Sequence, residues 1–294
     1  MQQHRPPVCP HRSHLHTFSP NRPTRRSATP TVRPVTEPAS VLDTPRHVLT
    51  AVEFDVLWEW LGLGPTPVVL QIASPGRSHL ERRAVQADAW RGLRARGLAG
   101  SDGPEAELVR LLHLLARPTE QLELRAVWGR EVRVLGSGRA GVAALGHRTE
   151  GTVTVTACGS LPAALVSAFP PASRGAGRAC TAPTAALAGV PVADARPALL
   201  RHGVPAAEAS LLVRMLTDTD RRAQVVALAA DRWGVLRRAG GVLGVLDGAR
   251  GRYLLTRSAG DDGTEWVTVA PADTRELRHR ITQLLATANA TAAG

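Results

Sequence analysis

The fold is decided by residues 121–156, which read QLELRAVWGREVRVLGSGRAGVAALGHRTEGTVTVT. Apolar and polar side chains alternate in short runs here, as in residues 121–128, 131–135 and 151–156. Glycines punctuate the runs, at Gly129, Gly136, Gly138, Gly146 and Gly151. Alternation of this kind predicts half-buried strands. Because the connections are short and carry no helical pattern, the strands are expected to form an antiparallel meander.

Helical patterns flank this meander, and the same order of elements then returns. Helices are predicted over residues 105–116 and 161–169, and again over 205–216 and 274–286, with short strands between 224 and 269. The segment EAELVR at Glu105 resembles EASLLVR at Glu208, an offset of about 103 residues. This recurrence predicts an internal duplication with two quasi-symmetric helix–meander–helix halves. The expected fold class is α+β, a central antiparallel sheet flanked by helical bundles.

Upstream of the first meander, an edge strand is expected over 49–54, a helix over 54–61, a strand over 68–72 and a helix over 78–96. Residues 1–47 hold nine prolines and no apolar periodicity, so they are predicted to be a disordered, dispensable tail, with Val48 as an alternative start of translation. The expected domain is 48–287, made of an N-terminal half at 48–169, a linker at 170–192 and a C-terminal half at 193–287. Residues 288–294 are expected to be a disordered C-terminus.

The composition excludes several classes of protein. The 294 residues are 44% hydrophobic and 21% charged, and no apolar run reaches the roughly 18 residues of a membrane span. Three cysteines, Cys9, Cys158 and Cys180, do not form a disulfide framework and favour a reducing, cytoplasmic setting. The net charge is +11, but the tail alone contributes +5 of it, which weakens the case for nucleic-acid binding.

None of the motifs in the sequence predicts a cofactor, metal or catalytic site. Residues 136–141, GSGRAG, satisfy G-x-G-x-x-G but open another strand rather than a helix, which predicts a hairpin turn and not a dinucleotide site. A possible zinc cluster, Cys9, His11, His14 and His16, lies in the proline-rich tail and lacks a scaffold. Cys158 and Ser160 have no histidine in a context that suggests a base. We therefore expect no catalytic residue, no cofactor and no metal.

Three passages resemble the ESX secretion-associated protein family, the EspG family of actinobacterial type VII secretion chaperones. They are LTAVEFDVLWEWLGLGP at 49–65, the helix-to-strand passage from Pro205 to QVVA at 224–227, and GRYLL at 251–255 with EWVTVAPAD at 265–273. The likeness spans about residues 48–287. Its motifs are structural rather than catalytic.

This resemblance implies a function and a binding region. Members of the family are cytosolic chaperones that bind the helical tip of a PE–PPE-type secretion substrate, keep it soluble and steer it to its secretion system. In the family, the contact uses a loop of the first meander, the sheet and the C-terminal helical bundle. Here these regions correspond loosely to residues 130–141 and to the helix that carries Leu211 and Leu212. The expected partner-binding residues are Arg139, Leu212, Arg214 and Met215.

Other interpretations remain open. The helical spacing of Leu212 and Met215 is also that of core residues, and Arg139 also fits a solvated hairpin. Trp128 and Trp233 stand at equivalent strand ends in the two halves, which favours duplicated packing. For the whole protein, the alternative to a chaperone is a basic nucleic-acid-binding regulator, followed by an enzyme with an unrecognised site.

Overall fold

The structure is a computed structural model that describes residues 45–217 and 219–294, all within one compact unit, Val41–Gly294. The cysteine–histidine cluster at Cys9 and nearly all of the expected tail lie outside the described residues. Strand β1 begins at Arg46, two residues before the expected domain start at Val48. His47 is buried in this strand, with its Nδ1 3.3 Å from a carboxylate oxygen of Glu105.

The two halves of the unit repeat one order of elements. The first half contains β1 Arg46–Thr50, α1 Ala51–Trp60, the 3-10 helix η2 Val68–Leu70, α2 His79–Ala95, α3 Ala106–Ala116, β2 Glu120–Val127, β3 Glu131–Arg139, β4 Val142–Thr149, β5 Thr152–Cys158 and α4 Leu161–Ser167. The second half contains β6 Cys180–Pro183, the 3-10 helices η3 Thr184–Ala186 and η4 Val192–Asp194, α5 Ala195–Arg201, α6 Ala206–Leu216, β7 Thr219–Ala230, β8 Leu236–Gly248, β9 Gly251–Ala259, β10 Glu265–Pro271 and α7 Thr274–Ala293.

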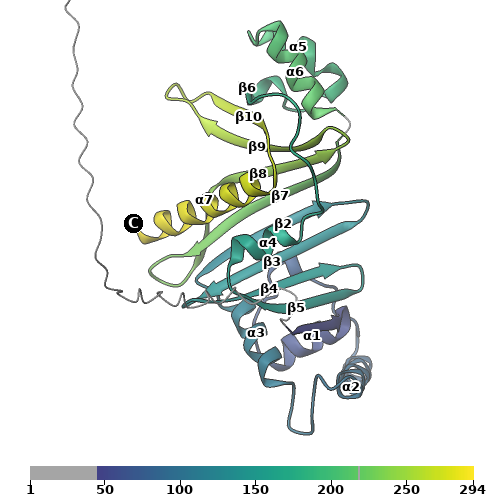
Figure 1. Ribbon diagram of the computed structural model, residues 1–294. Coiled ribbons are helices and arrows are strands. Elements are labelled where there is room, and N and C mark those ends of the chain that lie inside the picture. Colours follow the sequence, from purple (N-terminus) through teal and green to yellow (C-terminus); the bar gives the residue numbers. More distant parts are fainter. Residues whose placement is uncertain (1–44, 218) are drawn as a thin grey trace, which may run out of the picture. The chain divides into compact units, whose positions relative to one another are not determined.

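A single sheet runs through both halves (Figure 1). Its strand order is β1-β5-β4-β3-β2-β7-β8-β9-β10-β6, and every neighbouring pair is antiparallel. The halves meet where β2 pairs with β7, from Glu120 opposite Ala229 to Val127 opposite Arg222. The order reads alike from either edge inwards, so the predicted α+β class, the central antiparallel sheet and the two quasi-symmetric halves are confirmed.

Helices cover the two faces of the sheet differently. On one face, α4 and α7 pack on a core that both halves share, with Leu122 and Leu124 of β2 beside Val225 of β7. We call this the shared face; Figure 1 shows α7 lying across β7 and β8. The alternate side chains of the same strands point to the opposite face, which we call the bundle face. There α1 and α3 cover one end, and α5 and α6 cover the other.

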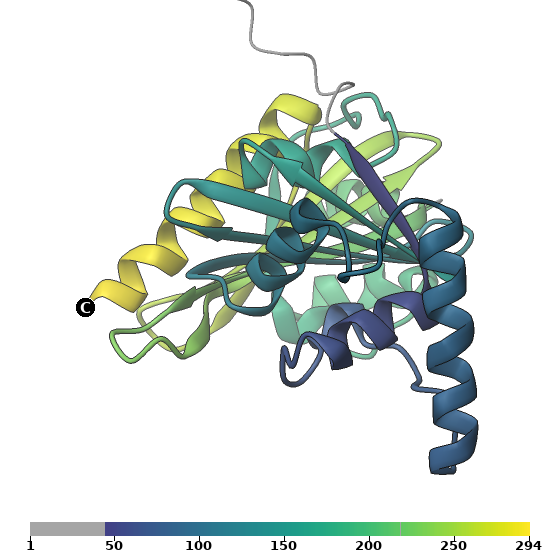
Figure 2. The same ribbon diagram turned by 90° about the horizontal axis from the view of Figure 1, so that it is seen from below.

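Local sequence explains the N-terminal bundle. Thr50 and Ser78 open α1 and α2 with capping boxes, each accepting a hydrogen bond from the backbone of the glutamate three residues later. In α3, Leu108, Leu111, Leu112 and Leu115 form one buried face. Helix α2 buries only Ala89 and Leu93 and projects from the body (Figure 2).

Two expected strands near the N-terminus are wrong. The strand expected over 49–54 ends at Thr50, because the capping box starts α1 at the next residue. Residues 68–72 were expected to form a strand, but Val68–Leu70 form η2, a single turn that begins after Pro67. Val69 and Leu70 are fully buried in this turn, because their side chains pack against the sheet. Their apolar character therefore reflects this packing and not a strand.

The expected linker, residues 170–192, is ordered and contains β6 and η3. A buried side chain explains this order. Arg252 pairs with Asp247 through Nε–Oδ1 and Nη2–Oδ2 distances of 2.7 and 2.8 Å, and donates to the carbonyl of Pro170 at 2.8 Å. The Tyr253 hydroxyl donates to the carbonyl of Ala176 at 3.0 Å. These bonds fix the connection between the halves to the start of β9.

The C-terminus also differs from the expectation of disorder over 288–294. Helix α7 continues to Ala293, and Ala288 is fully buried against the shared face. Asn289 donates a hydrogen bond of 2.9 Å to the carboxylate of Glu120 in β2. Alanine-rich sequence favours the helical conformation, and its small side chains let the helix lie close to the sheet.

Candidate partner-binding surface

An apolar groove lies on the bundle face of the second half. Its floor is formed by β7 to β10 and its roof by the segment η3–η4–α5–α6, which we call the helical cap. The groove has a volume of about 360 Å³, and we call it the cap groove. Its apolar lining includes Leu187, Val190, Leu216, Val242, Leu255 and Val267. This volume is at the lower end of the range of roughly 300–1,000 Å³ that ligand pockets in proteins span.

The groove exists because the cap sits over the edge of the sheet. Helix α6 packs on β6 and on α5, whereas its counterpart α3 lies across β3, β4 and β5. Leu212 and Met215 of α6 fill a small core with Tyr253, Val269 and Cys180. This core holds the cap over the outer strands, so the bundle face of β7, β8 and β9 stays partly open.

A few polar groups face this apolar space. Arg257 of β9 lines the groove and is exposed, and within the described residues it has neither a carboxylate nor a hydrogen-bond partner. The hydroxyl of Thr184 in η3 is buried and has no hydrogen-bond partner among those residues. Gln224 of β7 is exposed beside them. Arg257 and Gln224 thus give the groove a polar margin that solvent reaches, whereas the Thr184 hydroxyl is enclosed by the chain itself.

The turn between β2 and β3 borders the same region. Val127 lies opposite Arg222 of β7 and is 57% exposed. Trp128 packs against Phe169 with ring centroids 5.4 Å apart, and Gly129 takes a φ of +74° that suits glycine. A strip of exposed side chains on the bundle face, with Arg125, Arg222 and Gln224, connects this turn to the cap groove.

The expected partner-binding residues do not lie together on one exposed surface. Leu212 and Met215 are 0% and 1% exposed, so their side chains belong to the core of the cap. Arg214 lies on the same helix and is exposed. Arg139 is exposed and donates to the carbonyl of Arg117 at 3.1 Å, at the end of β3 away from the β2–β3 turn. The spacing of α6 predicts an apolar stripe, but it does not distinguish a stripe that packs on a core from one that faces a partner.

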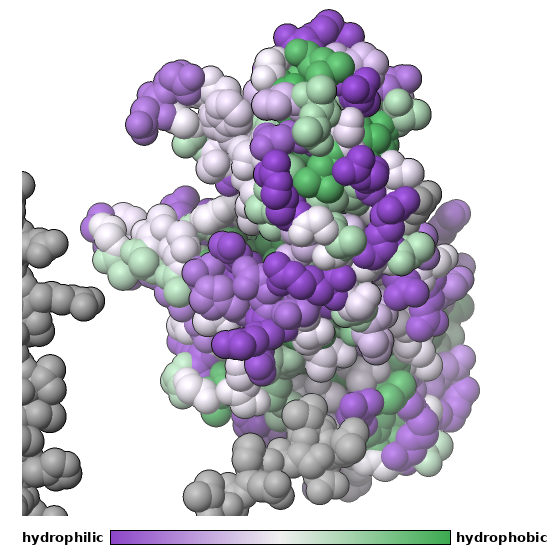
Figure 3. All heavy atoms as spheres, turned by 45° about the horizontal axis from the view of Figure 1, so that its top comes forward, coloured by the Kyte–Doolittle hydropathy of each residue, from purple (hydrophilic) through white to green (hydrophobic). Residues whose placement is uncertain are grey.

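Hydrophobic residues also gather on the outer surface of the cap. Figure 3 shows them over the top of the molecule, where the cap lies. Leu200 at the end of α5 is among the exposed large apolar side chains. Sequence patterns missed the groove residues because they are spread over the segment from η3 to α6 and over four strands, and no single helix or strand contributes more than two of them.

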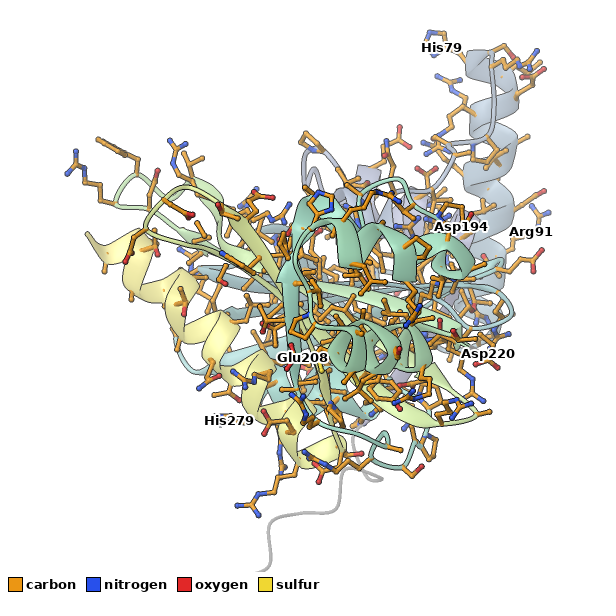
Figure 4. All side chains as sticks on the ribbon, turned by 90° about the horizontal axis from the view of Figure 1, so that it is seen from above. His79, Arg91, Asp194, Glu208, Asp220 and His279 are labelled. Atoms are coloured by element: carbon orange, nitrogen blue, oxygen red, sulfur yellow. The ribbon has the colours of Figure 1, made fainter. Side chains whose placement is uncertain are left out.

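The groups considered for catalysis are dispersed. Burial raises the pKa of the Cys158 thiol to about 11, which disfavours the thiolate that nucleophilic catalysis requires. The GSGRAG motif forms the end of β3 and the turn to β4, with Ala140 and Gly141 at positive φ, so the predicted hairpin turn is confirmed. No group of three or more His, Cys, Asp or Glu side chains in residues 45–217 and 219–294 could hold a metal ion. In Figure 4, His79 on α2 and His279 on α7 lie on opposite sides, away from Asp194 and Glu208 on the cap.

The part of the chain that the structure describes contains no helix long and apolar enough to cross a membrane.

Comparisons with known proteins agree with this architecture. A family model described as the EspG family matches residues 50–283. Among solved structures, the chain is similar to the Mycobacterium tuberculosis type VII secretion system chaperone EspG5 in complex with the PE25-PPE41 dimer. That match has a TM-score of 0.63 and 17% sequence identity, and it covers 83% of this chain and 96% of the other. No curated protein matches the sequence.

Proposed function

The chain belongs to the EspG family, and from this premise we propose that it is a cytosolic substrate-recognition chaperone of a type VII secretion system. In this proposal it binds the helical tip of a PE–PPE-like substrate, keeps that substrate soluble and targets it for export. The similar chaperone EspG5 was solved in complex with a PE25-PPE41 dimer, which supports a partner of this class.

The observation that carries the proposal is the open cap groove. A chaperone for a helical tip needs an apolar surface that the folded chain itself leaves uncovered, bordered by polar groups that limit nonspecific association. The cap groove has this character, with aliphatic walls and Arg257 and Gln224 at its margin. The adjoining strip and the β2–β3 turn extend the surface across the centre of the sheet.

Co-purification tests this function. We propose to co-express the chain with PE–PPE-like pairs encoded in the same genome and to isolate complexes by affinity and size-exclusion chromatography. Ala188 is exposed at the mouth of the groove, so Ala188→Arg should block the groove and abolish the complex without lowering the melting temperature. The matched control is Ala95→Arg, at the exposed end of α2, which should bind as the wild type does.

Two outcomes would contradict the proposal. One is the absence of a complex with every such pair; the other is a complex that Ala188→Arg leaves intact. The alternative, a nucleic-acid-binding regulator, instead requires binding to DNA or RNA that falls steeply with salt. That binding should disappear when residues 1–44 are removed, because much of the net charge lies in that stretch.

A further inference from the structure

Two hairpin turns, β3–β4 and β7–β8, lie at the same end of the sheet. Gly138 of β3, Glu120 of β2 and Ala229 of β7 stand in one row across the strands. Strand β3 ends at Arg139 and β7 at Ala230, each one residue beyond this row, and the turns follow there. Three strand spacings of about 4.8 Å therefore separate the midpoints of the turns, which is roughly 14 Å. We call this part of the molecule the hairpin end.

Exposed apolar side chains stand at both turns. Trp233 and Val235 in the β7–β8 turn are 69% and 50% exposed, and Val142, which follows the β3–β4 turn, is 48% exposed. These side chains lie at the tips of hairpins, where they contribute little to a core. They form a small apolar surface that faces away from the body of the sheet.

Trp233 differs in this respect from its counterpart in the first half. Trp128 stands at the equivalent strand end and packs against Phe169, with ring centroids 5.4 Å apart. The ring of Trp233 is instead accompanied by a cation, since the guanidinium of Arg232 lies 4.0 Å from its centroid. The duplicated packing expected for the two tryptophans is therefore absent at Trp233.

The hairpin end is also basic. Exposed arginines border both turns: Arg117, Arg139, Arg232, Arg237 and Arg238. Of the acidic groups beside them, Asp231 pairs with Arg237 at 2.7 Å, and the carboxylate of Glu120 accepts a hydrogen bond from Asn289. The five guanidinium groups thus outnumber the carboxylates, and the turns present a positive surface.

The surroundings add to this charge. Arg46, the first residue of β1, stands opposite Thr156 of β5, two residues before the level of the row through Gly138. Residues 1–44, which hold six arginines and two acidic residues, therefore join the described chain near the hairpin end. The acidic β9–β10 turn lies well away, because β9 parts from β8 beyond Leu255 (Figure 1).

This combination of side chains suits a lipid surface. Tryptophan favours the membrane–water interface, because its ring is apolar and its N–H is polar. Arginine can lay its aliphatic stem on the apolar region and keep its charge at the phosphates. Nucleic acid also attracts arginines, but it stacks on several aromatic side chains and offers little to valines. Trp233 is the single aromatic residue of the two turns.

We propose that the hairpin end rests on the surface of an anionic lipid bilayer, with Trp233, Val235 and Val142 at the level of the headgroups and the arginines at the phosphates. The contact is peripheral. The β2–β3 turn lies at the other end of β2, roughly 25 Å away for a strand of this length, so lipid and a protein partner there would use separate surfaces. This inference does not rest on the proposed function.

Vesicle sedimentation tests the inference with the full chain. The probes are vesicles of phosphatidylcholine with about 30% phosphatidylglycerol, and vesicles of phosphatidylcholine alone, near physiological ionic strength. The chain should sediment with the anionic vesicles and stay in solution with the neutral ones. Binding should weaken as salt is added, because the surface potential of the lipid is screened.

Trp233→Ala separates insertion from charge, because it leaves every arginine in place. It should weaken binding roughly tenfold, as expected when a large apolar side chain no longer leaves water. Lipids brominated on their acyl chains should quench the tryptophan fluorescence of the wild type more than that of Trp233→Ala. The matched control is Trp60→Ala, which removes another exposed tryptophan, on α1, and should bind as the wild type does.

Removing arginines tests the charge. Arg232→Ala with Arg238→Ala should weaken binding about 25-fold, since each arginine near an anionic surface contributes about fivefold. Arg83→Ala with Arg91→Ala removes the same charge from exposed positions on α2 and should leave binding nearly unchanged. Melting temperatures verify that all four variants are folded.

The inference is overturned if the chain ignores anionic vesicles, if the α2 pair weakens binding as much as the hairpin pair, or if Trp233→Ala changes neither binding nor quenching. A DNA duplex bound in place of vesicles, with the same dependence on Trp233 and Arg238, would overturn it as well. That result would assign the hairpin end to nucleic acid.

Discussion

Met215 illustrates what a single residue type can and cannot indicate. A methionine and two leucines at helical spacing predict an apolar stripe, and methionine suits an adaptable docking surface. The same stripe is required wherever a helix packs on a core. In α6 the stripe faces β6 and β9, where Leu212 and Met215 contact the core of the cap. The sequence therefore predicts the stripe, and the position of the cap decides what the stripe contacts.

We predict that Met215→Asp unfolds or aggregates the protein. The side chain is 1% exposed, and an unpaired carboxylate there would lose its hydration without gaining a partner. This cost is several kcal/mol, a large part of the roughly 5–15 kcal/mol that stabilises a typical domain. Thermal denaturation followed by circular dichroism, together with the soluble yield, measures the effect.

Arg214→Asp is the matched control, because Arg214 precedes Met215 and is exposed on the same helix. It should keep the wild-type melting temperature, and any loss of substrate binding would then report on a direct contact. If Met215→Asp instead remained folded and lost only the substrate, Met215 would be part of the interface, as the sequence first suggested.

At the scale of elements, prediction from sequence succeeded where the local pattern is long. The meander, the helix expected over 105–116 and that over 205–216 agree with β2 to β5, α3 and α6 within a residue or two at the helix ends. Each has several turns or alternations that specify its buried face. These elements also reveal the duplication, and hence the order of the strands.

Prediction failed where an element depends on distant residues. Strand β6 has four residues and exists because it pairs with β10, more than 80 positions later in the chain. Helix η2 has the composition of a buried strand but follows a proline and fills a space above β4. The cap groove could not be predicted for the same reason, since its shape depends on where α6 rests.

The last turns of α7 give a prediction at this scale. Ending the chain after Thr287 removes Ala288, which is fully buried, and the hydrogen bond from Asn289 to Glu120. The expected loss is about 1–2 kcal/mol, from one hydrogen bond and a small apolar contact. For a domain of this size, that loss lowers the melting temperature by roughly 2–8 °C.

A chain that ends after Ala292 serves as the control, because it keeps both contacts, and its melting temperature should stay near that of the full chain. Equal melting temperatures for the two truncated chains would mean that the end of α7 contributes nothing to stability.

At the scale of the whole molecule, the shared face joins the two halves into one structure. The sheet is continuous through β2 and β7, and the core beneath it takes side chains from α4 in the first half and α7 in the second. The bundle face also carries buried cores, beneath α1 and α3 in the first half and beneath the cap in the second, but the cap leaves part of this face open at the cap groove. The proposed binding surface and the shared core therefore lie on opposite faces of β7 to β9, whose side chains alternate between the two faces.

This continuity predicts that the halves unfold together. Tyr253 is the single tyrosine of the chain and is buried in the second half, so fluorotyrosine there reports by ¹⁹F NMR on that half. Fluorescence of the tryptophans, four of which (Trp58, Trp60, Trp90 and Trp128) lie in the first half, reports mainly on the other. Both signals should change at the same denaturant concentration, as a two-state transition requires.

Leu165→Ala sharpens the test because Leu165 of α4 is fully buried in the shared core. The cavity should cost about 2–5 kcal/mol and should move both transitions by the same amount, although Tyr253 belongs to the other half. Independent halves would behave differently: the fluorescence transition alone would move, and the ¹⁹F signal would keep its midpoint. Such a result would mean that the β2–β7 junction joins two separately stable domains, and that the cap groove can be opened or closed without consequence for the first half.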